Sequence, residues 1–150
     1  MAHDCATTRV GLALVAITVT IVMTSTQSPE RFRARLSIVP VDFASVATTS
    51  GSGEVTAELR GREFTVEVMF AGLSSPATRA DVRNAEKGQR GAVAFTLDIG
   101  TATATAGAFD DTVTLTETQV AELRQERYYL QIRTEGNPNG EIRGWFLVRE

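Results

Sequence analysis

Beyond its first thirty residues the chain alternates between apolar and polar positions with a period of two. The clearest runs are residues 54–59 and 64–70, which are joined by a tight connection at 60–62. Alternation of this kind places successive side chains on opposite faces of a strand. We therefore predict a β-hairpin in this part of the chain.

Further strands are predicted along the rest of the chain. Residues 78–84 place Ala80 and Val82 on one strand face and Asp81 and Arg83 on the other. Residues 116–124 indicate a short helix capped by Thr116. Residues 100–107 form a Thr/Ala tract that fits a flexible loop or a poorly packed edge strand equally well. The other predicted strands are 31–41, interrupted by Pro40, and 92–97, 111–115, 128–134 and 141–148. 

Short strands separated by turns favour an all-β fold. We expect an immunoglobulin-like antiparallel β-sandwich of about seven to eight strands with one short helix. No second domain and no internal repeat is indicated, so residues 31–150 are assigned to a single domain.

Residues 1–28 have the layout of an export signal or a membrane anchor. An uncharged apolar run from Val10 to Met23 follows Arg9 and is closed by polar residues. As a helix of about 1.5 Å rise per residue this run spans roughly 21 Å, less than the ~30 Å hydrocarbon core of a bilayer. It predicts a hydrophobic leader helix. Cleavage as a signal peptide and retention as a membrane tether through residues 10–24 both stay open, and either places the domain outside the cytoplasm.

The charge pattern excludes one class of partner. The net charge is −3 and neither sign forms a long block, so nucleic-acid binding, which needs a basic stripe, is not expected. The basic cluster Arg31, Arg33 and Arg35 alternates onto one strand face. A solvated face explains it, and contact with anionic lipid head groups is the alternative. Cys5 is the only cysteine and precedes the apolar run, so the domain has no disulfide.

The C-terminal part carries the most specific motif. Residues 128–144 read Tyr-Tyr-Leu-Gln-Ile-Arg-Thr-Glu-Gly-Asn-Pro-Asn-Gly-Glu-Ile-Arg-Gly. This segment resembles the closing motif of CHRD (chordin-type repeat) domains, and weaker likenesses at 51–59 and 71–78 extend the resemblance over residues 32–148. The resemblance implies an exported protein of the bacterial kind, with a binding or structural module more than an enzyme. The residues that match the core of the motif are Gly140, Glu141, Ile142, Arg143 and Gly144.

One departure from the family pattern bears on metal binding. Family members commonly carry three imidazoles at the positions that are Asp81, Arg83 and Arg133 here, and the sole histidine of this chain is His3. A guanidinium cannot ligate a metal and one carboxylate is insufficient, so we expect no metal and no other cofactor. Instead we expect Asp81 to pair with Arg133 or Arg83, because an unpaired buried charge costs several kcal/mol. Three separately solvated surface charges are the alternative.

The remaining chemistry also argues against catalysis. With no histidine beyond the leader, Ser-His and Cys-His nucleophiles are excluded. We therefore expect a non-catalytic extracytoplasmic binding or scaffold module, whose partner is an unknown protein or cell-envelope ligand. The alternative is a metal-dependent or redox enzyme on a β-sandwich, which the missing histidines disfavour. Residues 137–140, Asn-Pro-Asn-Gly, are predicted to join the last two strands as a hairpin with Gly140 at positive φ.

Overall fold

The computed structural model describes residues 28–39 and 46–150. Every strand pairing in it is antiparallel, which confirms the predicted all-β class. The strands are β1 (Glu30–Ile38), β2 (Ser52–Arg60), β3 (Glu63–Ala71), β4 (Ala77–Asn84), β5 (Ala92–Leu97), β6 (Gly107–Thr114), β7 (Tyr128–Thr134), β8 (Ile142–Trp145) and β9 (Leu147–Arg149), with a 3-10 helix η1 (Val46–Thr48) and an α-helix α1 (Glu117–Arg124).

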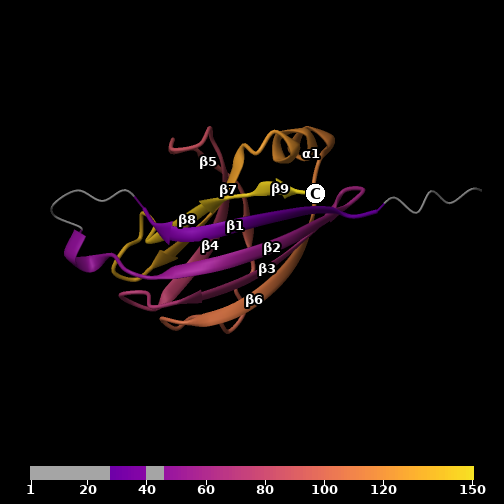
Figure 1. Ribbon diagram of the computed structural model, residues 1–150. Helices are drawn as coiled ribbons and strands as arrows, with labels where there is room; N and C mark the ends of the chain where they lie inside the picture. Colours follow the sequence, from indigo (N-terminus) through magenta and orange to yellow (C-terminus); the bar gives the residue numbers. More distant parts are fainter. Residues whose placement is uncertain (1–27, 40–45) are drawn as a thin grey trace, which may run out of the picture.

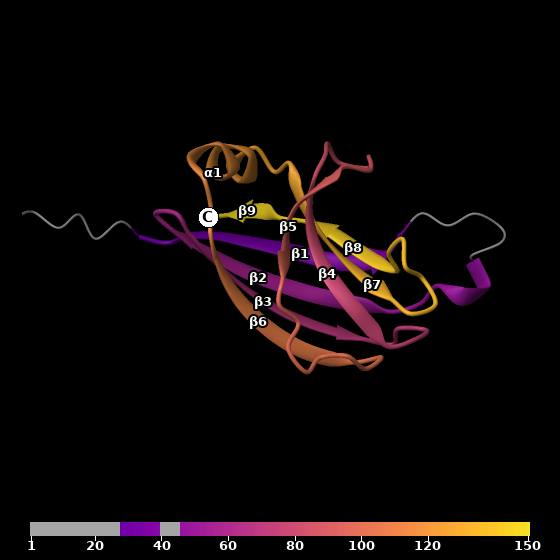
Figure 2. The same cartoon turned by 180° about the vertical axis from the view of Figure 1, so that it is seen from behind.

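The strands follow one continuous hydrogen-bonded path, in the order β5-β4-β7-β8-β1-β2-β3-β6, with β9 on β1. Strand β1 belongs to both halves of this path, because its residues 30–36 pair with β2 while Ser37 and Ile38 pair with β8. The path curls over so that β4 and β7 lie across from β2 and β3 (Figures 1 and 2). The expected two layers are thus formed by a single curved sheet.

The core lies between the two halves of the sheet. At its centre the ring of Phe64 on β3 meets Phe32, Phe95 and Phe146 edge-on, with centroid separations of 6.1, 6.5 and 5.4 Å. Edge-to-face packing adds to the stabilisation that burial of the rings provides. Helix α1 begins with the expected cap at Thr116 and lies at one end of the sheet (Figure 1).

Two segments complete or correct the sequence interpretation. The predicted last strand, 141–148, is divided at Phe146, whose ring enters the core and whose N–H donates to the Tyr128 carbonyl at 3.0 Å. Beyond Phe146 the pairing partner changes, because β8 pairs with β7 from Ile142 to Trp145 whereas β9 pairs with β1 from Leu147 to Arg149. The Thr/Ala tract is a loop up to Ala106. Its carbonyls at Ala104 and Thr105 accept the N–H groups of Ala77, at the start of β4, and of Leu73, in the β3–β4 connection.

Some of the predictions for the N-terminal part concern residues that the structure does not describe. The leader helix, the tether at residues 10–24 and Pro40 lie outside the described ranges. Within those ranges, no helix has the length and apolar character needed to cross a membrane. Arg31, Arg33 and Arg35 are all exposed on one face of β1, as the alternation predicts.

Candidate functional site

The positions at which the resemblance implied imidazoles, Asp81, Arg83 and Arg133, lie on adjacent strands. In the β4–β7 ladder Arg79 faces Arg133, Asp81 faces Gln131 and Arg83 faces Tyr129. The residues between them on β4, Ala80 and Val82, are fully buried in the core. Asp81 and Arg83 therefore project from the outer face of the sheet, as the alternation predicts.

Asp81 is a buried carboxylate between two arginines. Its side chain is 0% exposed, and its Oδ2 lies 2.7 Å from Nε of Arg133. This contact is ionic, because the Arg133 N–H is not aligned for a hydrogen bond. The other oxygen, Oδ1, accepts hydrogen bonds from Arg79 Nε at 2.6 Å and from Thr96 Oγ1 at 3.0 Å. The ion pair expected between Asp81 and Arg133 is present, and Arg79 is a second partner.

Arg83 does not join this ion pair. Its Nη1 donates to the carbonyl of Gly91 at 2.7 Å, and the Gly91 N–H donates to Tyr129 Oη at 3.1 Å. The β4–β5 register shifts between Val82 and Arg83, and a bulge of this kind re-aims the side chain beside it. Arg83 thus holds the β4–β5 loop, residues 85–91, against the outer face instead of contacting Asp81.

Arg143 fastens the same loop from β8. It is 6% exposed, and its guanidinium carbon lies 4.9 Å from the Trp145 ring centroid and 5.5 Å from that of Tyr129. Its two terminal nitrogens donate to the carbonyls of Gln89 and Gly88 at 3.2 and 3.4 Å. The buried cation is stabilised by ring faces and carbonyl dipoles, since Arg143 has no ion pair within the described part of the chain.

Glu141 is a second buried carboxylate, at the end of the sheet opposite α1. Its Oε1 accepts the backbone N–H groups of Ser50 at 2.9 Å and of Ser74 at 2.8 Å, and its Oε2 accepts the Thr134 hydroxyl at 2.7 Å. These partners lie beside η1, in the β3–β4 connection and at the end of β7. One side chain therefore joins the segment after η1 and the β3–β4 connection to the end of β7. These segments lie at the end of the sheet away from α1 (Figure 2).

The environment of Glu141 favours its charged form. Burial by itself raises the pKa of the carboxyl, but the hydrogen bonds from Thr134, Ser50 and Ser74 outweigh it, so the pKa of Glu141 lies below its ordinary value. A carboxylate that accepts several fixed N–H and O–H donors is held ionised and in place.

A comparison with known protein families identifies the family of this chain. A model of the CHRD domain matches residues 32–146, well over half of the chain. The chain belongs to the CHRD domain family. The comparison found no similar curated protein and no similar solved structure. The CHRD match includes both buried carboxylates and the β4–β5 loop.

The glycines of the CHRD motif are required by close approaches. Gly140 has φ +113°, and a Cβ there would lie 2.1 Å from the side-chain nitrogen of Gln131. A Cβ on Gly144 would lie 2.3 Å from the Arg35 carbonyl oxygen. The hairpin prediction is confirmed, because β7 and β8 pair in antiparallel register from Tyr129–Trp145 to Ile132–Ile142. Ile142 is fully buried in the core.

Sequence reasoning missed several residues of these contacts. Arg79 lies two positions before Asp81 on the same strand, so period-two alternation could have placed both side chains on one face. Thr134 and the backbone of Ser50 and Ser74 gave no comparable signal, because their contact with Glu141 joins residues far apart in the sequence.

The side chains of the described residues form no metal-binding cluster. Within residues 28–39 and 46–150, no group of three or more His, Cys, Asp or Glu side chains is placed to hold a metal ion. The guanidinium groups of Arg79 and Arg133 contact Asp81 at 2.6 and 2.7 Å. Their positive charge repels a metal cation, so the residues present do not fit a metal there.

Proposed function

We propose that this CHRD domain is a non-catalytic binding or scaffold module that works outside the cytoplasm. The observation that carries the proposal is that both buried carboxylates are occupied by fixed protein contacts. Asp81 is held by Arg79, Arg133 and Thr96, and Glu141 by three donors. A general acid or base has to reach a proton on its substrate, and these two carboxylates face protein partners instead.

The extracytoplasmic part of the proposal rests on the leader. Residues 1–28 combine Arg9, an apolar run and a polar flank, the layout of an export signal. If the run directs export, replacing Val15 by Arg should keep a reporter fused after residue 30 inside the cell, because a charge in the apolar run is costly to insert. Unchanged export of the Val15→Arg fusion would contradict this part of the proposal.

The catalytic alternative is tested by metal loading. The full chain is incubated with Cu²⁺ or Zn²⁺, freed of excess metal and analysed for bound metal and for Tm. We expect no stoichiometric retention and no shift in Tm, because the guanidinium groups of Arg79 and Arg133 already occupy both oxygens of Asp81. One tightly held copper or zinc per chain, lost in Asp81→Asn, would overturn the proposal.

The binding role is tested by photo-crosslinking on the cells that make the protein. A photoreactive residue is placed in turn at the exposed positions Ser37, Thr56 and Thr112, which lie on three different strands. A discrete adduct from at least one position is the expected result. Exported protein that yields no adduct from any of them would contradict a binding or scaffold role.

A further inference from the structure

A groove of about 440 Å³ lies over β8 on the outer face of the sheet. Strand β1 lines one side of it and the β4–β5 loop contributes to the other, while β8 and the start of β9 form the floor. The side chains that define its chemistry are Arg35, Ile38, Lys87, Arg143, Trp145 and Leu147.

The groove is cationic and no carboxylate lines it. Arg35 lies opposite Glu54 in the β1–β2 ladder, but the Glu54 carboxylate pairs with Arg33 at 3.1 Å. In the described ranges Arg31 and Arg33 therefore have ion-pair partners, whereas Arg35 and Arg143 have none. Lys87 is paired with Glu126. The positive charge of the groove that has no carboxylate partner in this part of the chain therefore lies on Arg35 and Arg143.

The floor of the groove is already ordered. Arg143 is fixed by the Trp145 and Tyr129 rings and by two loop carbonyls, so binding would immobilise little of it. Gly144 lies against the Arg35 backbone and carries no side chain. A Cβ at Gly144 would meet the Arg35 carbonyl and the Leu36 side chain, so this position lets β8 pack closely on β1 and leaves Arg143 and Trp145 as the floor of the groove.

The groove also presents apolar surface. Ile38 is 46% exposed, and Trp145 and Leu147 are half-buried beside it. An inorganic anion or a purely polar polyanion would leave these side chains uncovered. An extended polypeptide, whose side chains alternate, can direct acidic residues to the arginines and apolar residues to Trp145 and Ile38.

On the basis of the binding function proposed above, we propose that this groove binds an acidic and partly apolar segment of a partner polypeptide. Its carboxylates contact Arg35 and Arg143, and its apolar side chains pack on Trp145, Ile38 and Leu147. Charge complementarity and the mixed lining together select this class of partner over lipid head groups or free anions.

The chain carries its own reporter for this site, because Trp145 is its only tryptophan. The probe is the peptide acetyl-Glu-Leu-Glu-Val-Asp-Leu-Glu-amide, titrated into the full chain while tryptophan fluorescence is followed. We expect a saturable change. Polyglutamate, inorganic phosphate and a peptide with Lys at each acidic position should each bind at least about tenfold more weakly. Vesicles with anionic lipid can bind through the apolar run at residues 10–24, so Arg35→Glu should leave any vesicle binding unchanged.

Two groove variants and one matched control test the assignment. Arg35→Glu and Ile38→Glu should each weaken binding of the peptide about tenfold or more, since one reverses a charge and the other removes apolar contact. Arg60→Glu changes an exposed arginine outside the groove lining and should leave binding unchanged. Circular dichroism and Tm confirm that each variant is folded.

Several results would overturn the proposal. They are an unchanged fluorescence signal at millimolar peptide, equal binding of polyglutamate or phosphate, vesicle binding that Arg35→Glu abolishes, or equal loss in Arg60→Glu. Crosslinks from Thr56 or Thr112, together with no fluorescence change on addition of the peptide, would reject this site while leaving the binding function intact. Absence of every crosslink would reject the binding function itself.

Discussion

Each half of the sheet has an ion pair between an arginine and a carboxylate on neighbouring strands, but the two pairs differ in their exposure to solvent. Arg33 and Glu54 lie 3.1 Å apart on β1 and β2, with side chains 50% and 57% exposed. Arg133 and Asp81 lie 2.7 Å apart on β7 and β4, with side chains 25% and 0% exposed. Charges that keep their hydration gain little from pairing, whereas a carboxylate that has lost its water depends on its partners.

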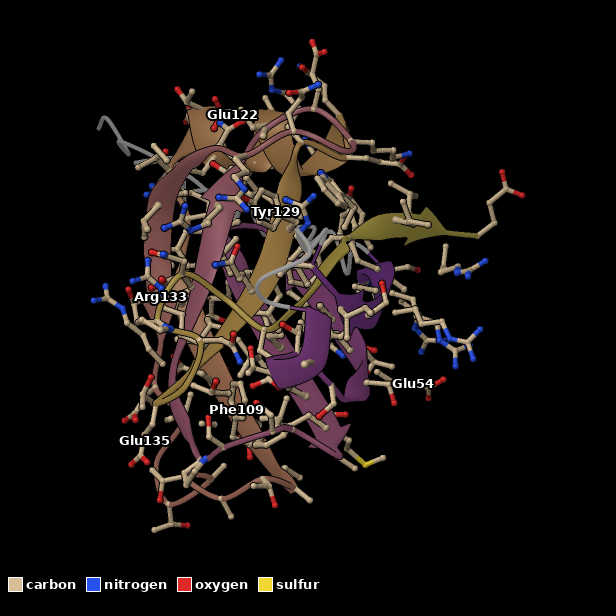
Figure 3. The ribbon with its side chains drawn as sticks, turned by 90° about the vertical axis from the view of Figure 1, so that its left-hand side faces the viewer. Glu54, Phe109, Glu122, Tyr129, Arg133 and Glu135 are labelled. Carbon is tan, nitrogen blue, oxygen red and sulfur yellow. The ribbon has the colours of Figure 1, made fainter. Side chains whose placement is uncertain are left out.

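The covering of the outer face creates this difference. Strands β2 and β3 alternate between buried and solvent-facing residues, so their outer face meets water. In β7 every residue except Arg133 is buried, because Gly91 of the β4–β5 loop contacts Tyr129, and Asn139 and Glu141 contact Gln131 and Thr134. Figure 3 shows Arg133 and Tyr129 on β7 and, on the other side of the molecule, Glu54. Arginine and carboxylate side chains thus form a solvated surface in one half of the sheet and buried structural contacts in the other.

The comparison also locates the surface that is available to a partner. Polar side chains over β4 and β7 are fixed by contacts within the chain, and those over β2 and β3 are mostly paired with neighbours across the strands. The groove lies where the two halves of the sheet meet on β1. There, within the described residues, Arg35 has no carboxylate partner, because Glu54, which lies opposite it, pairs with Arg33.

The largest expected effect is at Glu141. Glu141→Gln should lower the free energy of unfolding by about 3 kcal/mol, because the amide cannot accept all three donors and brings a donor of its own toward them. Urea denaturation of the full chain measures this. The control is Glu135→Gln, an exposed neighbour in the same turn, which should change the stability by less than about 0.5 kcal/mol. Equal stabilities of the two variants would refute the structural role of Glu141.

Two hairpin glycines give the next comparison. Gly140 joins β7 to β8 with φ +113° and close contact to Gln131, whereas Gly61 joins β2 to β3 with φ +62° and nothing within 4 Å. Gly140→Ala should therefore cost about 2–3 kcal/mol, and Gly61→Ala about 1 kcal/mol, since alanine tolerates the left-handed helical region at moderate cost. Thermal unfolding distinguishes the two, and a larger effect at Gly61 would show that the β7–β8 turn is not the constrained one.

The two ion pairs are compared by removing one charge from each. Asp81→Asn should cost about 2 kcal/mol, because it leaves Arg79 and Arg133 with a neutral partner at a buried position. Glu54→Gln should cost at most about 0.5 kcal/mol, because its arginine stays hydrated. Both values come from denaturant unfolding at low salt. Comparable losses in the two variants would mean that burial of Asp81 does not matter.

The smallest effect is a change with pH. Because the pKa of Glu141 is lower in the folded protein, its charged form stabilises the fold fully above about pH 4.5 and loses this contribution as the pH falls through the folded pKa. The stability difference between the wild-type chain and Glu141→Gln should therefore shrink in acid. Glu30, Glu58 and Glu126, whose pKa values are also lowered, titrate alike in both proteins and cancel. A difference that stays constant down to about pH 3 would contradict this assignment.

The sequence predicted what depends on neighbours along the chain. Alternation gave the strands and placed Asp81 on the face opposite Ala80 and Val82, and the Asn-Pro-Asn-Gly turn gave the last hairpin. The partner of Arg83 could not be predicted in this way, because the bulge beside it and the covering loop are set by the register of β4 with β5.

The role of Glu141 was out of reach for a similar reason. Its donors Ser50 and Ser74 lie far away in the sequence and contribute backbone N–H groups, which every residue type except proline carries. The continuous sheet path was likewise not predictable, because β1 shows no sequence signal that its two ends pair with different strands.

The central claim is that the Asp81–Arg133 pair is a structural contact that stabilises the fold because Asp81 is buried. A double-mutant cycle with Asp81→Asn, Arg133→Gln and both together measures its coupling free energy directly, and the cycle of Glu54→Gln with Arg33→Gln provides the matched reference. We predict a coupling of about 1.5–3 kcal/mol for the first pair and below about 0.5 kcal/mol for the second. A coupling near zero between Asp81 and Arg133, or equal values in the two cycles, would contradict the account.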